Sequence, residues 1–334
     1  MKLRFAFAGF RHVHIADLYK RVERHPNCTI VAAVEEDAAA YAAAETNWGV
    51  ALTANNYAAI WQEEFDVLAI GERYGKHGAL AIAALEAGKH VIADKPICIT
   101  LEELRQIREA AISKGLKVGC MLDLRDNATV NAAKKIAASG ALGEIHAVNF
   151  SGQHPLNYGV RHAWYFEPGM HGGTINDIAI HGLDLAEWIT GRRLTGIASA
   201  RCWNAFAEHA PHFLDSAQFS AVLDNGGGVI ADVSYSAPNS QGYKLPAYWR
   251  MTFWGRLGSM EFNYAEPGVR LALDGETEPR IVPTEAPDHD YLDAFLADVA
   301  GTPTELNTEH ILEISRKTLM LQEFANRSQK VTSL

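Results

Sequence analysis

The chain has 334 residues, enough for one large domain or, as we expect, two ordinary ones. Hydrophobic residues make up 48% and charged residues 21% of the sequence, so the chain can build a core and is not of the disordered class. Its net charge of −10 repels nucleic-acid phosphates and anionic lipids. No apolar run approaches the ~18 residues of a membrane helix. We therefore expect a soluble protein with neither nucleic-acid nor membrane partners.

The start of the chain does not read as a secretion signal, because Arg11 and His12 interrupt the apolar run too early. The cysteines are widely spaced and include no CxxC pair, which argues against both a zinc cage and a disulfide framework. They are Cys28, Cys98, Cys120 and Cys202. Reduced, buried thiols in a cytoplasmic protein are the simplest interpretation.

The first part of the chain alternates short apolar runs with longer helical patterns, which is typical of βαβ units and a parallel sheet. Strands are expected at 3–8, 29–34, 66–70, 90–93 and 117–121. Helices are expected from Ile15 to Val22, where apolar residues recur at helical spacing, and at about 76–87. The following helix opens with Thr100 and Glu103, a spacing that predicts a capping box.

Beyond about residue 143 the pattern changes to period two. Residues 217–223 and 229–235 alternate apolar and mostly polar side chains around the turn-forming sequence DNGGG, which predicts an antiparallel hairpin. A second hairpin is expected around Gly255 and Gly258. Such a sheet needs cover on one face, and the strongest helical candidate is 174–190.

These patterns predict two domains of different type. The boundary is placed between residues 122 and 123, so that the domains span 1–122 and 123–334. Helical pattern returns from about residue 290, and these last helices are able to pack back on the first domain.

The loop after the first strand has part of a dinucleotide-binding fingerprint. Gly9 stands where a strand meets a helix, and helix amides there favour a pyrophosphate. Arg11 and His14 replace the second and third fingerprint glycines, so a plain structural turn remains an alternative.

An acidic run ends the second expected strand. Glu35 follows His14 by 21 residues, where an acidic group would accept hydrogen bonds from the ribose hydroxyls. With Glu36 and Asp37 beside it, a 2′-phosphate would meet like charge, which favours NAD over NADP. A phosphate contact from Arg11 keeps NADP open, and the acidic run could equally be the solvated start of the next helix.

Two longer motifs carry a family resemblance. Residues 84–96, ALEAGKHVIADKP, closely resemble the "ALEAGKHVxxEKP" motif of the Gfo/Idh/MocA oxidoreductases, with Asp94 in place of Glu. Residues 172–184, GGTINDIAIHGLD, are similar to the family's "GGGxxxDxxxHxxD". Gly140 and the Gly-Glu-Ile at 143–145 match the stretch that joins the domains, as does Arg125. Residues 71–74, GERY, depart from the usual "ATPN"-like cofactor loop, although His77 fits.

The resemblance implies a fold and an activity. The fold is an N-terminal Rossmann domain with a doubly wound parallel sheet, followed by an α+β domain with a large open, mainly antiparallel sheet that forms a homodimer or homotetramer. The activity is that of an NAD(P)-dependent dehydrogenase acting on a sugar, cyclitol or related polyol, with no metal. The expected cofactor contacts are Gly9, Phe10, Arg11, His12, Glu35, Gly71, Glu72, His77, Asp94, Lys95 and Arg125.

The second motif concentrates titratable side chains. Asp177, His181 and Asp184 are spaced i, i+4, i+7, which places them on one helix face. Hydride removal from an alcohol also requires loss of the hydroxyl proton, a role that suits His181. By analogy with the family, the Lys95 ammonium would stabilise alkoxide-like charge, and Asp177 would hold a substrate hydroxyl.

Further substrate contacts are expected from the second domain. His154 and Trp164 are the chosen candidates, with Gln153, Arg161 and His171 in the same loops. An aromatic ring such as Trp164 often packs on a sugar face, but it is also a common core residue.

Two other functions compete with this interpretation. An amidohydrolase-type hydrolase could bind metal through residues that occur in a plausible order, namely His12, His14, Lys95, His154, His181 and Asp215. The expected antiparallel hairpins argue against the βα barrel that it needs. The other alternative is a non-catalytic dinucleotide sensor, against which Lys95, Asp177 and His181 argue. His209 and His212 are interpreted as part of a histidine-rich loop.

Overall fold

The computed structural model describes residues 2–327, which form two compact units. The first contains the chain up to Met121 together with His162–Gly172 and Tyr291–Arg316; the second contains Leu122–Arg161, Gly173–Asp290 and the chain from Lys317. The assignment of 1–122 to the cofactor and of 123–334 to the substrate stays a prediction. Among the described residues, no helix has both the length and the apolar character needed to cross a bilayer.

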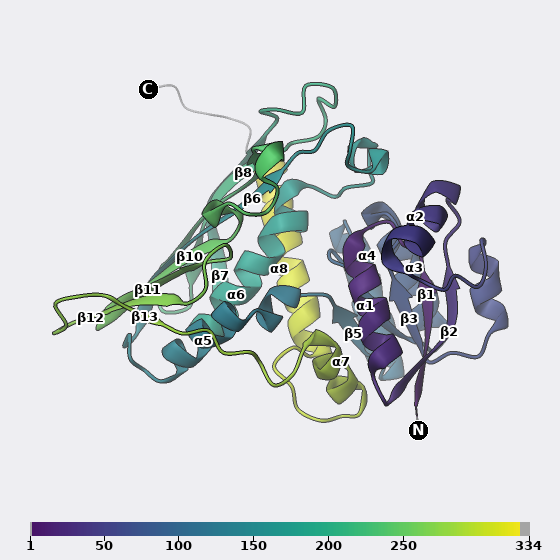
Figure 1. The fold of residues 1–334 in the computed structure, drawn as a ribbon, viewed down its shortest axis with the longest axis horizontal. Coiled ribbons are helices and arrows are strands. Elements are labelled where there is room, and N and C mark those ends of the chain that lie inside the picture. Colours follow the sequence, from purple (N-terminus) through teal and green to yellow (C-terminus); the bar gives the residue numbers. More distant parts are fainter. Residues whose placement is uncertain (1, 328–334) are drawn as a thin grey trace. The chain divides into compact units, whose positions relative to one another are not determined.

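The first unit is built on a five-stranded parallel sheet with the order β2-β1-β3-β4-β5 (Figure 1). Its strands are β1 (Leu3–Ala8), β2 (Cys28–Val34), β3 (Val67–Ile70), β4 (His90–Ala93) and β5 (Val118–Cys120). Its helices are α1 (Val13–Arg24), α2 (Ala38–Trp48), η1 (Tyr57–Gln62), α3 (Tyr74–Glu86), α4 (Leu101–Lys114), η3 (Ala163–Phe166) and α7 (Tyr291–Val299).

The strand order creates a switch point in this sheet. The chain moves from β1 to β2 in one direction and from β3 through β4 to β5 in the other. Because parallel crossovers are right-handed, the connecting helices α1 and α3 cover opposite faces of the sheet. In such sheets, ligands bind at the carboxyl ends of the strands beside the reversal, here between β1 and β3. The predicted doubly wound sheet is confirmed.

Local signals fixed several boundaries of the first unit. β1 and β4 begin and end where expected, and α3 begins at Tyr74, two residues before the predicted start. The Thr100 hydroxyl accepts the Glu103 amide at 3.1 Å, as a capping box requires. The Glu103 carboxylate, however, accepts the amide of Ile99 at 3.2 Å, so the return bond is made one residue earlier than the motif predicts.

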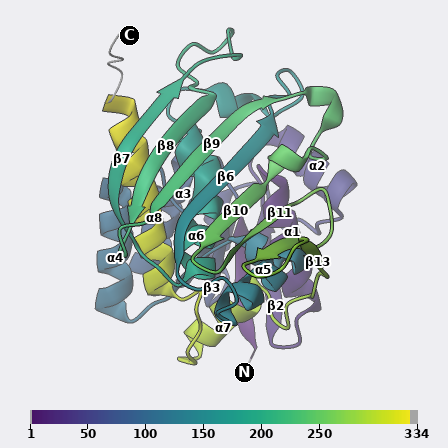
Figure 2. The same ribbon diagram turned by 90° about the vertical axis from the view of Figure 1, so that its left-hand side faces the viewer.

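The second unit is built on an eight-stranded sheet with the order β13-β12-β11-β10-β6-β9-β8-β7, whose strands lie side by side in Figure 2. The strands are β6 (Ile145–Pro155), β7 (Leu194–Trp203), β8 (Ser216–Leu223), β9 (Gly228–Ala237), β10 (Arg250–Gly255), β11 (Gly258–Asn263), β12 (Val269–Leu273) and β13 (Arg280–Val282). All neighbours pair antiparallel except β6 and β9. Both predicted hairpins, β8–β9 and β10–β11, are confirmed.

Helices cover one face of this sheet. They are η2 (Asp123–Asp126), α5 (Ala128–Ala138), η4 (Ile175–Ala179) and α6 (Ile180–Thr190), while η5 (Asn239–Gln241) and η6 (Pro246–Tyr248) lie in a loop. A Cβ atom on Gly182 of α6 would collide with the Phe150 ring of β6, so glycine permits this close packing. The final helix, α8 (Thr308–Arg327), contributes to both units, with the change at residues 316 and 317.

These two open sheets exclude the barrel of the amidohydrolase alternative. The described strands form one parallel and one mainly antiparallel sheet, and neither is a closed ring of eight parallel strands. All four cysteines are buried with free thiols, as expected.

Candidate active site

The loop after β1 passes close to the loop after β3. Gly9 has a φ angle of +86°, and a Cβ atom on it would lie 2.8 Å from the Glu72 backbone. The Arg11 amide donates to the Gly71 carbonyl over 2.7 Å. Because glycine alone combines this conformation with such a close approach, the single fingerprint glycine is a structural requirement of the switch point.

Glu35 is fully buried at the end of β2, and both of its carboxylate oxygens accept hydrogen bonds from the protein. Oε2 accepts the Phe10 amide at 2.7 Å, and Oε1 accepts the Asp37 amide at 2.7 Å and lies 2.9 Å from the Arg11 guanidinium. Burial raises the pKa of Glu35, and these donors act in the opposite direction. A ribose would have to share or replace them, so ribose recognition by Glu35 stays a prediction.

The Arg11 side chain lies among three carboxylates. Besides Glu35, it lies 3.4 Å from Asp37 and 3.5 Å from Glu72. The Tyr57 hydroxyl donates to Glu72 over 2.5 Å. Burial opposes ionisation of Glu72, but hydrogen bonds from Tyr57 and the Arg73 amide lower its pKa below the ordinary value. The charge of Arg11 is therefore compensated locally, which weakens its attraction for an added phosphate.

A pocket of about 340 Å³ opens beside this network. It is lined by Glu35, Glu36, Ala38, Tyr41, Ala54 and Asn55. The Glu36 carboxylate accepts the Tyr57 amide at 2.7 Å. The lining therefore includes two consecutive acidic residues, of which the Glu35 carboxylate is fully buried, and this negative charge disfavours a phosphate.

His12, His14 and Asp94 meet at the carboxyl ends of β1 and β4. The Nδ1 atoms of His12 and His14 lie 2.7 and 3.2 Å from separate oxygens of Asp94. Burial, then repulsion from His14, lower the pKa of His12 to about 4. Burial would raise the pKa of Asp94, but the two imidazoles hold it well below its usual range. The carboxyl group is therefore ionised at neutral pH.

Lys95 follows Asp94 and is 4% exposed. Its Nζ lies 5.8 Å from the centre of the Tyr74 ring. The Tyr74 hydroxyl shares a 2.9 Å hydrogen bond with the Tyr165 hydroxyl, and the two rings form a buried cluster with Trp164. Trp164 is itself 4% exposed. The structure therefore places Trp164 in a core, and its contact with a substrate stays a prediction.

The same cluster explains why residues 162–172 belong to the first unit. The Gly75 amide at the start of α3 donates to the Met170 carbonyl over 2.8 Å. The Tyr165 ring lies 6.3 Å from the His12 ring. Aromatic side chains from this later segment therefore surround the carboxyl ends of the parallel strands.

His77 joins the loops after β3 and β4. It is fully buried, with Nε2 at 2.7 Å from the Glu72 carbonyl and Nδ1 at 2.8 Å from the Pro96 carbonyl. His77, predicted as a cofactor contact, therefore has a structural role, because it links the two loops through these hydrogen bonds. A direct cofactor contact stays a prediction.

Asp177 and His181 lie on the helical segment of the second unit, which starts with a π turn at Ile175–Ala179. The predicted helix at 174–190 is present, but its first turns are wider than expected. Asp177 accepts the hydroxyl of Tyr235 from β9, and His181 Nε2 lies 3.9 Å from Asp123. π turns occur frequently at functional sites.

Asp184, the third titratable residue of the same motif, forms a buried ion pair with an arginine. Its oxygens accept from Arg125 Nε at 2.8 Å and Nη2 at 2.5 Å, and both side chains are buried. The Arg125 guanidinium also lies over the Trp188 ring. This bidentate pair ties η2 to α6, so Asp184 has a packing role. The predicted cofactor contact of Arg125 stays a prediction.

His154 lies at the end of β6 among aromatic rings. Tyr248 is the nearest of these, at 4.9 Å between ring centres, followed by Tyr243, Trp249 and Tyr235. The arrangement can hold an imidazole against the face or edge of a ligand, but its role in substrate binding is still a prediction.

Four tyrosines contact residues near those predicted for the site, although the sequence does not single them out as functional. They are Tyr57, Tyr74 and Tyr165 in the first unit and Tyr235 in the second. Tyr74 ends the GERY segment that departs from the family's cofactor loop, which is the one sequence signal at this position. The other three make their contacts through tertiary structure within their own unit.

The comparisons with known proteins identify the family. Residues 3–121 match the model described as an oxidoreductase family with an NAD-binding Rossmann fold, and residues 130–261 match the GFO/IDH/MocA C-terminal domain. A levoglucosan dehydrogenase from Pseudarthrobacter phenanthrenivorans is 33% identical over 34% of this chain and 30% of its own length. Inositol 2-dehydrogenase 2 from Saccharopolyspora erythraea is 27% identical over 69% of this chain and 63% of its own.

A solved structure shares the fold over nearly the whole chain. A levoglucosan dehydrogenase in complex with NADH superposes with a TM-score of 0.81 at 20% identity, over 98% of each chain. The two matched family models lie in the expected order and together span most of the sequence. The chain is therefore a member of the Gfo/Idh/MocA oxidoreductases, with an NAD-binding Rossmann domain at its N-terminal end.

Proposed function

We propose that the protein is an NAD-dependent dehydrogenase that interconverts a secondary alcohol and a ketone on a sugar, cyclitol or related polyol. The observation that carries the proposal is that Lys95 stands in the first family motif, His181 stands in the second, and each is only 4% exposed. Such shielded groups strengthen electrostatic interactions with a reacting oxygen. The names of the levoglucosan and inositol dehydrogenases support the substrate class.

The proposed roles follow from the chemistry of alcohol oxidation. The nicotinamide, when bound, accepts or supplies the hydride. His181 takes the hydroxyl proton during oxidation and returns it during reduction. Lys95 stabilises the negative charge that develops on the same oxygen. Asp177, held by Tyr235, positions a hydroxyl of the substrate.

We propose NAD as the preferred cofactor. The support is the pocket lined by Glu35 and Glu36, together with the local neutralisation of Arg11 by carboxylates. A 2′-phosphate placed in this pocket would meet the Glu36 carboxylate, beside a network in which Arg11 is outnumbered by Glu35, Asp37 and Glu72. Ribose hydroxyls, by contrast, can donate hydrogen bonds to a carboxylate.

The assigned roles are tested with Lys95→Ala and His181→Ala. We expect turnover in a polyol screen to fall at least about a thousandfold in each variant, with NADH affinity within a few-fold of the unchanged protein. His209→Ala, an exposed loop histidine, is the matched control and should retain turnover. Retained turnover in both site variants would overturn the assignment.

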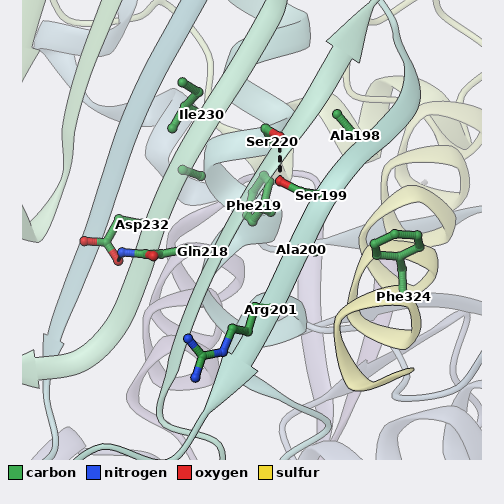
Figure 3. Close-up of a pocket in the computed structure, with 11 residues that line it drawn as sticks. Ala198, Ser199, Ala200, Arg201, Gln218, Phe219, Ser220, Ile230, Asp232 and Phe324 are labelled. Atoms are coloured by element: carbon green, nitrogen blue, oxygen red, sulfur yellow. Dashed lines mark hydrogen bonds between the residues drawn. The ribbon is translucent and has the colours of Figure 1, made fainter. Parts of the chain in front are cut away.

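We also propose a homodimer or homotetramer that uses the open face of the second sheet. A shallow surface pocket of about 760 Å³ lies over β7, β8 and β9 (Figure 3). Ile230 is exposed there, and Arg201 and Asp232 give the face both charges, which allows opposite charges to meet between two copies. Light scattering should give a multiple of the chain mass that Ile230→Lys reduces. Ile112→Lys on α4 of the first unit, where the side chain is similarly exposed, is the control. A monomeric unchanged protein would contradict the proposal.

A further inference from the structure

Three side chains with metal-binding atoms converge at the carboxyl ends of β1 and β4. They are His12, His14 and Asp94, and their ligand atoms all lie within 4.8 Å of one another. The two strands are not neighbours, because β3 lies between them. The cluster therefore depends on the fold and not on a local motif.

Its geometry can be compared with that of a metal centre. Zinc binds imidazole nitrogen and carboxylate oxygen at about 2.0–2.2 Å, which places tetrahedral ligand atoms about 3.3–3.6 Å apart. His12 Nδ1 lies 2.7 Å from one oxygen of Asp94, His14 Nδ1 lies 3.2 Å from the other, and the candidate ligand atoms all lie within 4.8 Å of one another. Metal binding would replace these hydrogen bonds and draw the three side chains together.

The residue types also suit a cation. Asp94 brings a fully buried carboxylate, and His12 and His14 each bring an imidazole nitrogen. Imidazole nitrogen and carboxylate oxygen are common ligands of transition-metal ions. The side chains of His12 and His14 are 17% and 26% exposed, which leaves the imidazoles accessible from solvent.

The sequence adds an independent observation. His14 stands where a dinucleotide fingerprint has its third glycine, and Asp94 stands where the family motif has Glu. These two departures, 80 residues apart in the chain, meet in space with His14 Nδ1 and Asp94 Oδ1 3.2 Å apart.

We infer that His12, His14 and Asp94 form a binding site for a divalent transition-metal ion, with zinc as the representative ion. Two imidazoles and one carboxylate suit Zn²⁺, Co²⁺ and Fe²⁺ better than Mg²⁺ or Ca²⁺, which prefer all-oxygen sets. Three protein ligands leave a coordination position open to solvent or to a ligand oxygen. The inference revises the expectation of no metal, and it does not depend on the proposed dehydrogenase activity.

The site is tested by zinc binding to the full-length, tag-free protein. After treatment with a chelator, the protein is dialysed against buffered micromolar Zn²⁺ and its metal content is measured. We expect one bound zinc per chain, with affinity weakened at least about tenfold in His14→Ala and in Asp94→Asn, because each removes one of three ligands. His209→Ala/His212→Ala, which removes two exposed histidines elsewhere, should bind zinc like the unchanged protein.

A second measurement needs no variant and so does not depend on folding of the substituted proteins. Diethyl pyrocarbonate modifies accessible imidazoles, and mass spectrometry locates the modified residues. Bound Zn²⁺ should protect His12 and His14 while His209 reacts as before. Absence of zinc from the unchanged protein, unchanged binding in His14→Ala and Asp94→Asn, or equal modification with and without zinc would overturn the inference.

Discussion

Two buried carboxylates, Asp94 in the first unit and Asp184 in the second, differ in the chemistry of their partners. Asp184 is paired bidentately with Arg125, whose guanidinium does not lose its proton in proteins. Asp94 divides its oxygens between two imidazoles, which can exchange a proton for a metal ion. An aspartate carboxylate is therefore a structural ion-pair partner at Asp184 and a candidate metal ligand at Asp94. Because both side chains are buried, the difference in role comes from their partners.

The largest effect is expected from breaking the permanent ion pair. Arg125→Ala leaves the Asp184 charge buried without its guanidinium, and we expect a loss of about 3–5 kcal/mol in the free energy of unfolding. Urea denaturation followed by circular dichroism measures it. The double variant Arg125→Met/Asp184→Leu should regain part of the loss because no charge stays buried. A loss below about 1 kcal/mol in Arg125→Ala would break the comparison.

A smaller effect is expected at the imidazole-paired carboxylate. Asp94→Asn removes the negative charge, and its partner His12 is neutral, so the variant contains no buried charge without a partner. We expect the free energy of unfolding to fall by about 1–2 kcal/mol, the size of one or two hydrogen bonds. The same urea titration measures this value. If Asp94→Asn costs as much as Arg125→Ala, the two carboxylates have the same structural role and the distinction between them fails.

A third carboxylate, Asp298, sharpens the comparison through pH. It accepts from the Thr308 amide at 2.8 Å and the Thr308 hydroxyl at 2.6 Å, and it pairs with Lys117 at 2.9 Å. Burial acts to raise its pKa, but these partners lower it below the ordinary value. The unfolded chain therefore binds the proton more readily, so this contribution is present above the unfolded pKa of about 4 and is lost as pH falls through the folded pKa.

Asp298→Asn should remove that contribution. We expect a loss of about 1 kcal/mol at pH 7 and a weaker decline of stability below about pH 4 than in the unchanged protein. Urea midpoints measured from pH 7 down to pH 3 provide the test. Parallel pH profiles for the two proteins would show that Asp298 carries no such linkage.

Much of the fold could be predicted because its signals are local. The bounds of β1 and β4 follow from short apolar runs, and the β8–β9 hairpin follows from period two and the DNGGG turn. The π turn at Ile175–Ala179 could not be predicted, because the helical pattern continues through it. The packing of residues 162–172 against Tyr74 could not be predicted either, because it depends on tertiary contacts alone.

The candidate site shows the same limit. The family motifs locate Lys95, Asp177 and His181, and the spacing from His14 locates Glu35. Spacing does not reveal which groups donate to a carboxylate, so the Phe10 and Asp37 amides on Glu35 could not be predicted. The meeting of His14 and Asp94 was equally hidden, because it requires the strand order β1-β3-β4.

The most direct test of the central claim is a titration of the purified protein with NADH and with NADPH, followed by energy transfer from its seven tryptophans to the nicotinamide. We expect NADH to bind saturably and at least about tenfold more tightly than NADPH, because the acidic residues Glu35 and Glu36 repel a 2′-phosphate. Equal or tighter binding of NADPH would contradict the assigned cofactor preference. Binding of neither nucleotide would contradict the proposed dehydrogenase function itself.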